Sequence, residues 1–197
     1  MLALAALWLG CLFAGLLLAD FASGLIHWII DRYCEPETPV VGKHFVGLIH
    51  EHHRRPLAIF KLSVVRRNAG FVFLVSTVFA IFWMLGLLNP VTASAFVFGA
   101  FANQIHCWAH RRPKILWPIV RPLQRLGLLQ SARHHALHHG PCPNAHYCLI
   151  TDFVNPVVDT VNLWQRAEVA LMLVGVKPKD FVLPNPAYTA AAAARLT

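Results

Sequence analysis

The sequence carries little charge for its length. Only 13% of its 197 residues are Asp, Glu, Lys or Arg, whereas a soluble domain has about 25%. Hydrophobic residues make up 57% of the chain. So few charged side chains could not cover the surface of a soluble globule. The composition therefore excludes an ordinary soluble protein and favours an integral membrane protein with a single domain, residues 1–197.

Acidic residues and paired cysteines are also scarce. Nine acidic residues stand against 17 basic residues and 12 histidines, which gives a formal net charge of +8. A basic balance can indicate nucleic-acid binding. In a chain this apolar, the positive-inside bias of membrane proteins explains it better, and we expect no nucleic-acid partner. The five cysteines form no CxxC pair, which argues against a disulfide framework.

Uncharged runs predict three helices that cross the membrane, over about residues 4–30, 69–88 and 91–110. The Asn89-Pro90 turn joins the last two into a hairpin. A signal peptide is the rival interpretation of the first run, but it would need a basic amino-terminal region and a shorter apolar core. Residues 154–174 are either an interfacial helix or a shallow fourth span. The predicted fold is all-α, with three to four transmembrane helices.

Basic residues predict the orientation of these helices. Lys and Arg are frequent after the first helix and after the third, whereas the amino terminus and the hairpin turn have none. By the positive-inside rule, residues 31–68 and 111–185 lie at the cytoplasmic face, in loops or interfacial elements. We therefore expect a protein of a bacterial inner membrane or an organelle membrane, with a histidine-rich cytoplasmic cap.

The histidines converge on that cap. His106 and His110 form HxxxH, which places both rings on one helix face. Residues 135–139 form HxxHH with the same consequence, and residues 50–53 read HEHH. His27 lies near the cytoplasmic end of the first helix. One such cluster is weak evidence, but several at one membrane face predict a metal centre.

The number of imidazoles predicts two metal ions. Zinc sites close at about four ligands, and more histidines than that are available. Imidazole suits iron as well as zinc, so the ligand type does not name the metal. His50-Glu51 begins like the HExxH motif of zinc proteases, but Arg54 stands where the second histidine is needed. Asp31 shares a helix stripe with His27 and could either ligate a metal or orient that ring.

Six stretches of the sequence resemble a family of histidine-box membrane lipid desaturases. They are DFASGLIHWIID (20–31), TPVVG (38–42), EHHRRP (51–56), NQIHCWAH (103–110), RHHALHH (133–139) and YCLITDFVNP (147–156). The family contains plasmanylethanolamine desaturase, a related bacterial carotenogenesis-factor desaturase and the plant chloroplast phosphatidylglycerol desaturase. The resemblance covers residues 20–168 and implies a membrane enzyme with two non-haem iron ions.

The resemblance also implies which residues form the site, with no catalytic side chain beyond the metal centre. The metal ligands would be His27, His52, His53, His106, His110, His135, His138 and His139. Four further residues match the family and are expected to orient the ligands: Asp20, Asp31, Gln104 and Asn155. Four histidines fall where the family varies and are left out: His44, His50, His134 and His146.

One departure from the family bears on the substrate. The vinyl-ether-forming branch has an RHDF stretch, and then an acidic residue before its asparagine. This chain has KLSV at residues 61–64, followed by Arg66-Arg67-Asn68. The chloroplast branch also lacks that histidine. We therefore expect the substrate to be an acyl chain of a phospholipid, with a plasmanyl lipid as the alternative.

The chemistry that the resemblance implies is O₂-dependent desaturation. An unactivated methylene needs an oxidant, which reduced iron and O₂ supply. No flavin or haem motif is present, so electrons would come from a separate ferredoxin or cytochrome, which the basic face could attract. The lipid headgroup is expected near four arginines: Arg32, Arg54, Arg55 and Arg133. A lipid hydroxylase and a histidine-rich metal carrier are the rival functions, and the one-sided placement of the ligands disfavours the carrier.

Overall fold

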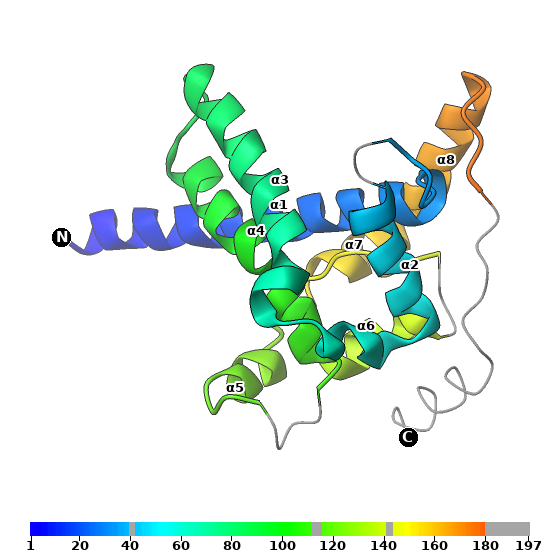
Figure 1. The fold of residues 1–197 in the computed structure, drawn as a ribbon. Helices are drawn as coiled ribbons and strands as arrows, with labels where there is room; N and C mark the ends of the chain where they lie inside the picture. The colour runs from blue at the N-terminus through cyan, green and yellow to red at the C-terminus, as the bar shows by residue number, and fades with distance from the viewer. Residues whose placement is uncertain (40–41, 112–115, 141–143, 180–197) are drawn as a thin grey trace.

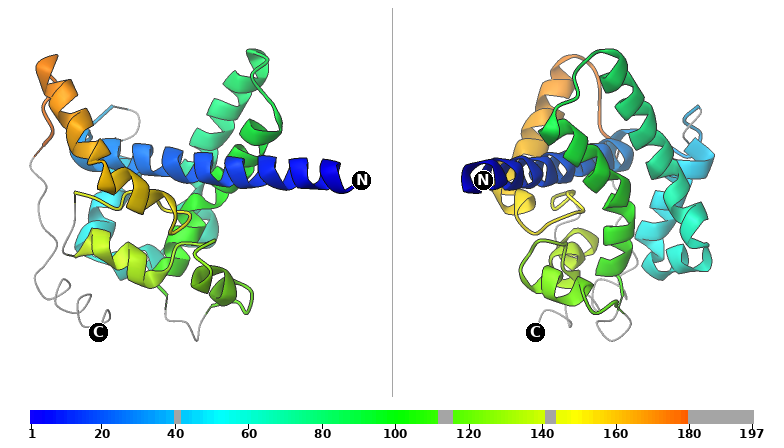
Figure 2. Two further views of the ribbon diagram at one scale, coloured as in Figure 1. Left: turned by 180° about the vertical axis from the view of Figure 1, so that it is seen from behind. Right: turned by 90° about the vertical axis from the view of Figure 1, so that its left-hand side faces the viewer.

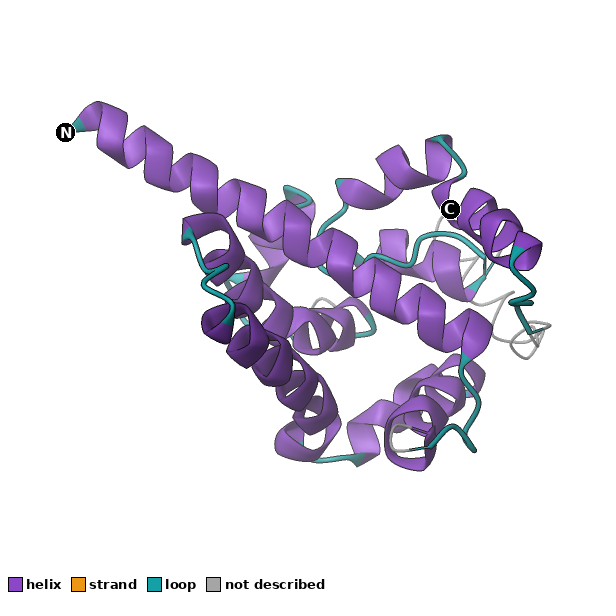
Figure 3. Ribbon diagram, turned by 90° about the horizontal axis from the view of Figure 1, so that it is seen from above, coloured by secondary structure: helices purple, strands orange, loops and turns teal. Residues whose placement is uncertain are grey.

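The computed structural model describes residues 1–39, 42–111, 116–140 and 144–179, without the side chains of residues 43 and 44. No strand occurs among these residues, which form helices joined by turns and loops (Figure 3). The elements are α1 (Leu2–Tyr33), the π-helix η1 (Gly42–Val46), α2 (Gly47–Arg54), the 3₁₀ helix η2 (Pro56–Lys61), α3 (Val64–Met84), α4 (Pro90–Ala109), α5 (Val120–Arg125), α6 (Ala132–His139), α7 (Val154–Thr160) and α8 (Leu163–Leu173). The prediction of an all-helical protein is confirmed for the described residues.

Capping residues explain where the two hairpin helices begin. α3 begins before the predicted residue 69, because the Ser63 hydroxyl accepts a hydrogen bond from the backbone amide of Arg66 at 3.2 Å. α4 begins as predicted after the hairpin turn, where Asn89 and Thr92 form a capping box. Both starts are therefore determined by local sequence.

Two helices among the described residues, α1 and α3, have the length and apolar character of membrane spans. Leu7, Trp8 and Phe13 are exposed on the first half of α1, and Phe73 and Trp83 are exposed on α3. An exposed apolar surface of this extent suits lipid rather than water. Both helices are therefore consistent with a membrane protein. The crossing of α4 stays a prediction, because this helix does not meet the same measure of length and composition.

The region considered for a fourth span, residues 154–174, does not form one continuous helix. α7 ends at Thr160, and α8 begins at Leu163 after Asn162, whose φ of 51° lies in the left-handed region. The 11 residues of α8 reach about 16 Å, which is too short for a hydrocarbon core of about 30 Å. These short helices fit the interfacial alternative.

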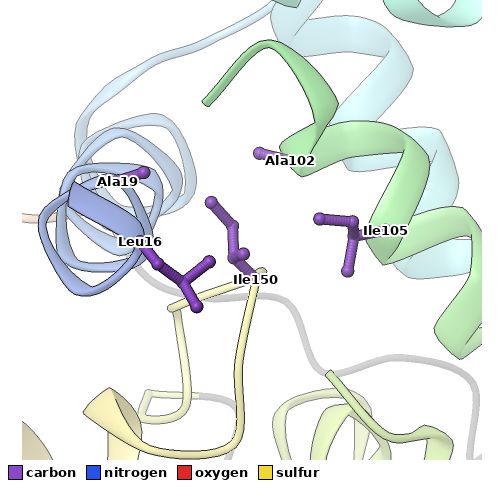
Figure 4. Packing of buried hydrophobic residues seen from close by; sticks show 5 residues of the cluster. All are labelled: Leu16, Ala19, Ala102, Ile105 and Ile150. Atoms are coloured by element: carbon purple, nitrogen blue, oxygen red, sulfur yellow. The ribbon is translucent and has the colours of Figure 1, made fainter. Parts of the chain in front are cut away.

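Within the α3–α4 hairpin, α4 packs across the middle of α1 and α3 packs against α4, while the first half of α1 projects beyond the rest of the chain (Figure 1). The crossing is close at Gly15, where a Cβ would clash with the Ser94 hydroxyl and lie 2.7 Å from the Val91 carbonyl oxygen. The core beside the crossing comes from α1, α4 and the loop before α7 (Figure 4): Leu16, Ala19, Ala102, Ile105 and Ile150. This packing holds the carboxyl-terminal halves of α1 and α4 side by side.

A loop before α7 is tied to the second half of α1, beside which α7 also lies (Figure 2). We call residues 147–152 the strap. The buried carboxylate of Asp20 accepts hydrogen bonds from the backbone amides of Ile150 and Thr151, at 2.7 and 3.1 Å, and from the Thr151 hydroxyl at 2.5 Å. Because charge-assisted bonds of this kind are strong, Asp20 fixes the strap against α1.

Candidate metal centre

Eight histidines and one aspartate form two adjoining groups. They come from α1, α2, α4 and α6, and all but His110 are buried. We call the first the five-histidine group: His52, His106, His110, His135 and His139. We call the second the aspartate group: His27, Asp31, His53 and His138. Within each group, one possible ligand atom from every residue lies within 4.8 Å of all the others. Every histidine predicted as a ligand from the sequence lies in one of the two groups.

Short helices set the directions of the rings. α6 begins after Ser131, whose hydroxyl accepts a hydrogen bond from the His134 backbone amide at 3.1 Å. Residues three and four apart share a helix face, so His135, His138 and His139 point into the same space. The HxxHH spacing thus places these three rings on one helix face, as the sequence predicts.

Nitrogen atoms converge in the five-histidine group. Nε2 of His110 lies 3.1 Å from Nε2 of His106 and 2.8 Å from Nε2 of His135. Two ligands bound about 2.0–2.1 Å from one ion, at angles of about 90–110°, lie about 2.8–3.4 Å apart. The nitrogens are therefore spaced much like ligands of a single metal ion.

A buried carboxylate organises the aspartate group. Oδ2 of Asp31 lies 3.1 Å from Nε2 of His53, 3.2 Å from Nε2 of His27 and 3.4 Å from Nε2 of His138. Asp31 is 1% exposed, and neither of its oxygens accepts a well-formed hydrogen bond from the described residues. A buried carboxylate is costly unless a positive charge compensates it. Asp31 thus lies among the ligand atoms themselves, whereas the resemblance assigned it to orienting them.

Backbone carbonyls determine the tautomers of three rings. Nδ1–H donates to a carbonyl oxygen over 2.8–3.1 Å in each of three pairs: His27 to Tyr147, His52 to Pro56 and His138 to Ala145. A carbonyl can only accept, so Nδ1 carries the proton and Nε2 keeps its lone pair. Such outer hydrogen bonds are typical of metal-binding histidines. The sequence does not reveal these carbonyl partners, because any residue type can supply a backbone oxygen.

Four of the clustered imidazoles, those of His52, His135, His138 and His139, are held neutral. Burial, and then neighbouring histidines, lower the pKa of His52, His135 and His139 well below its usual value. Burial, and then His27, lower the pKa of His138 to about 4, although Asp31 opposes this shift. Near neutral pH these rings are uncharged and can donate a lone pair to a metal.

Asp20 and Asn155, two of the residues expected to orient ligands, act at a distance through the strap. Asn155 Oδ1 accepts a hydrogen bond from the Cys148 backbone amide at 2.9 Å, and its Nδ2 donates to the Cys148 carbonyl at 2.9 Å. The strap includes Tyr147, whose carbonyl binds His27. Both side chains therefore position a ligand by holding the backbone that contacts it.

Gln104 was also expected to orient a ligand, and its placement does not fit that role. Its Oε1 accepts hydrogen bonds from Arg67 at 3.1 Å and from Asn68 at 3.2 Å. These contacts join α4 to α3. Gln104 therefore supports the helix hairpin rather than an imidazole.

Of the four histidines left out of the predicted ligand set, the three whose side chains the structure describes belong to neither group. Three of them have other partners: His134 contacts Asn155, His146 contacts Asp159 and His50 contacts Lys179. The side chain of His44 lies outside the described residues.

The arginines predicted to contact a lipid headgroup differ in their placement. Arg32 is buried, and its guanidinium donates to the Glu168 carboxylate at 2.6 and 3.2 Å and to the Lys179 carbonyl at 3.0 Å. This placement does not fit a headgroup role, because the side chain turns inward to a structural partner. The other three arginines are exposed: Arg54, Arg55 and Arg133.

A cavity of about 300 Å³ opens beside the metal centre, and we call it the central cavity. His27 of the aspartate group and His52 and His106 of the five-histidine group contribute to its wall. Other parts of the wall are apolar or charged, including Ile49, Ile59, Leu149, Glu51, Lys61 and Arg67. A molecule in this cavity would border both ligand groups.

The donor atoms fit two transition-metal ions. Imidazole nitrogen suits iron, zinc and other first-row metals, and a carboxylate suits iron as well. One ion would use about four to six of these ligands, so the nine donors are enough for two ions. Histidines that bind a metal typically donate their other ring N–H to a partner such as a backbone carbonyl, as His27, His52 and His138 do here.

Known proteins are similar to this chain over most of its length. A lipid desaturase domain model matches residues 16–181. "Fatty acid desaturase 4-like 2, chloroplastic" of Arabidopsis thaliana is 35% identical over 178 residues, which cover 88% of this chain and 63% of that protein. A probable fatty acid desaturase of Acanthamoeba polyphaga mimivirus is 33% identical and is covered over 83% of its length, with 84% of this chain. Plasmanylethanolamine desaturase 1 of Mus musculus is 32% identical, over 84% of this chain and 66% of that protein.

This chain spans less than two thirds of the length of the Arabidopsis relative. No solved structure matches this chain. The region matched by the domain model nevertheless includes every residue of both ligand groups. The resemblance inferred from the histidine motifs is therefore confirmed: the chain belongs to the lipid desaturase family.

Proposed function

We propose that this protein introduces a carbon–carbon double bond into an acyl chain of a membrane phospholipid, using two iron ions and O₂. The observation that carries the proposal is that two buried groups of metal-ligand type border one cavity. The five-histidine group would hold one ion and the aspartate group the other. The membership of the chain in the lipid desaturase family supports this assignment.

Iron fits the reaction better than zinc. An unactivated C–H bond needs an oxidant, which bound iron and O₂ supply when electrons are available. Two hydrogens from the chain, O₂, two electrons and two protons balance one double bond and two molecules of water. The two electrons must come from another protein, and an acidic ferredoxin or cytochrome is the partner that a chain of net charge +8 would attract.

The protein's own residues would bind and orient the substrate. The apolar wall of the central cavity, including Ile49, Ile59 and Leu149, suits a hydrocarbon chain and excludes water from the reacting carbons. Lys61 and Arg67 in the same wall suit a phosphate. The rings locked by backbone carbonyls stay in place while a chain enters.

The KLSV segment, where the sequence departs from the vinyl-ether-forming branch, bears on the preference for an acyl chain because part of it lines the central cavity. The KLSV segment begins with Lys61 and Leu62, and both residues line the wall. Overall similarity does not separate the two substrates, since the identities to the Arabidopsis and mouse relatives are 35% and 32%. The cavity-lining segment is therefore the better guide.

The proposal places the metal centre on the cytoplasmic side of the membrane. A cysteine-free variant with single cysteines at exposed positions would test this, at Leu57 near the centre and at Leu87 in the hairpin turn. We expect a membrane-impermeant thiol reagent to label position 87 from outside and position 57 only after permeabilisation. Labelling of position 57 in intact cells would contradict the proposed side.

The experiment that tests the function is expression in a host that lacks such an enzyme, followed by mass spectrometry of its phospholipids. We expect a new monounsaturated acyl chain and, after anaerobic iron loading, about two irons per purified chain. A vinyl-ether product would favour the plasmanyl alternative, and a hydroxylated chain would indicate a hydroxylase. Iron binding without any lipid product, when an electron donor is supplied, would indicate a carrier and contradict the proposal.

A further inference from the structure

We propose that a second, apolar cavity between α1, α3 and α4 holds the far part of the substrate's hydrocarbon chain and limits the chain length that the enzyme accepts. We call this cavity the groove. The inference rests on the proposed function, since it assigns the groove to the substrate of the central cavity.

The lining of the groove fits hydrocarbon. It has a volume of about 210 Å³, and its wall is almost wholly apolar, with Leu18 and Ile26 from α1, Phe71 and Val75 from α3, and Gly99 from α4. Two of these three helices are the candidate membrane spans. A partly open apolar groove between such helices is in contact with the bilayer, so its occupant is a lipid chain rather than water.

The groove adjoins the central cavity at Phe71. Phe71 lines both, is 7% exposed, and packs against Phe45 with ring centroids 5.2 Å apart. On α1, Ile26 of the groove is next to His27 of the cavity. A chain whose reacting carbons lie beside His27 would therefore run on past Phe71 into the groove.

Helix geometry gives the length of this path. The groove follows α3 from Phe71 to Phe82, and 11 steps of about 1.5 Å give about 16 Å. An extended hydrocarbon advances about 1.25 Å per carbon, because its bonds of about 1.5 Å zigzag. The groove thus has room for about 13 carbons beyond Phe71.

Small residues of α4 keep the groove open. Ala95 and Gly99 are one helical turn apart, on the same face, and both line the groove. A Cβ at Gly99 would meet only Val75 Cγ2, at 3.8 Å. A larger side chain at either position would fill space that the lipid chain needs.

Two variants test the inference, Gly99→Leu and Ala95→Leu, with Gly10→Leu as the matched control. Gly10 lies on the exposed part of α1 with nothing near its Cβ position, so the control makes the same change outside the groove. We expect Gly99→Leu to lower the yield from long chains about tenfold or more while short chains change less than about twofold. Ala95 lies about 6 Å farther from the metal centre, so its variant should accept chains longer by about five carbons.

A binding measurement separates this inference from the proposed function. Saturated lysophospholipids of about 8 to 18 carbons are added to the purified protein, and the melting temperature is recorded without turnover. The melting temperature should rise with chain length in the wild-type and Gly10→Leu proteins, and should level off at shorter chains in Gly99→Leu. If binding follows this pattern but no lipid product forms, the proposed function fails while the groove assignment stands. Identical dependence on chain length in all four proteins, or an equal loss for all lengths in both groove variants, would overturn the inference.

Discussion

The two ligand groups use the same kind of ring in different electrostatic settings. The five-histidine group contains only neutral donors, so a divalent ion there would keep two positive charges. The aspartate group contains the buried carboxylate of Asp31, which would compensate one of those charges. Since charge compensation strengthens binding in a buried site, we expect the aspartate group to hold its ion more tightly.

The groups also differ in how the protein holds them. Two rings of the aspartate group, those of His27 and His138, are oriented by backbone carbonyls, and Asp31 and His27 share the long helix α1. In the five-histidine group, His52 has such a carbonyl bond, and His106 lies on the long helix α4. Because the two groups are built on different long helices, the two sites should respond differently to mutation.

The largest effect is expected from removing a ligand of the five-histidine group. His135→Ala removes a buried nitrogen that no neighbour can replace, so activity should fall by more than the factor of about 10–100 typical of an outer partner. Iron should drop from about two ions to about one per chain, as measured by elemental analysis. His146→Ala is the control outside both groups and should keep most activity. Full activity in His135→Ala would show that the HxxHH box is not the reaction site.

Asp31→Asn tests the aspartate group directly. The amide keeps the size of the side chain but removes the charge that lies within 3.4 Å of three imidazoles. We expect affinity for one ion to fall about 10–100-fold, with the ion of the five-histidine group retained. Chelator titration of the loaded protein would measure both affinities. Equal losses from both groups would contradict the difference proposed between them.

A smaller effect is expected from Asp20→Asn, which weakens the strap without touching a ligand. The variant loses part of a three-bond, charge-assisted anchor, for which about 1.5–3 kcal/mol is typical. The melting temperature in detergent should fall by about 3–10 °C, while the iron content of the folded protein stays near the wild-type value. Loss of iron at unchanged melting temperature would instead make Asp20 part of the metal site.

The most gradual effect concerns pH in the metal-free protein. The pKa of His138 is lowered from 6.5 to about 4 in the folded state, so the unfolded chain binds more protons between these values. Stability should therefore be fully present above about pH 6.5 and decline as the pH falls towards 4. Melting curves of wild type and His138→Gln across this range would measure the slope. A slope as steep in the variant as in wild type would exclude His138 as a contributor.

Local sequence patterns were sufficient for the helix hairpin and for the spacing of the histidines within each box, whereas the full set of ligand histidines was predicted from the family resemblance. The hairpin turn depends on Asn89-Pro90 and its cap, and the helical spacing within HxxxH and HxxHH places those rings together whatever the rest of the chain does. The excess of apolar over charged residues likewise predicted a membrane protein. The turn and the spacing depend on residues a few positions apart, and the composition depends on no contact at all. All three can therefore be recognised from the sequence.

Only the tertiary structure divided the histidines into two groups and placed Asp31 among the possible ligand atoms, one of the two roles that its position on the stripe of His27 had left open. It also turned Arg32 inward to Glu168 and used Gln104 to join α4 to α3. Each of these outcomes depends on residues more than 30 positions apart, or on backbone atoms whose direction follows from the packing of α1, α4 and the strap. Residue type and spacing do not determine such contacts, because they form only when distant helices pack together.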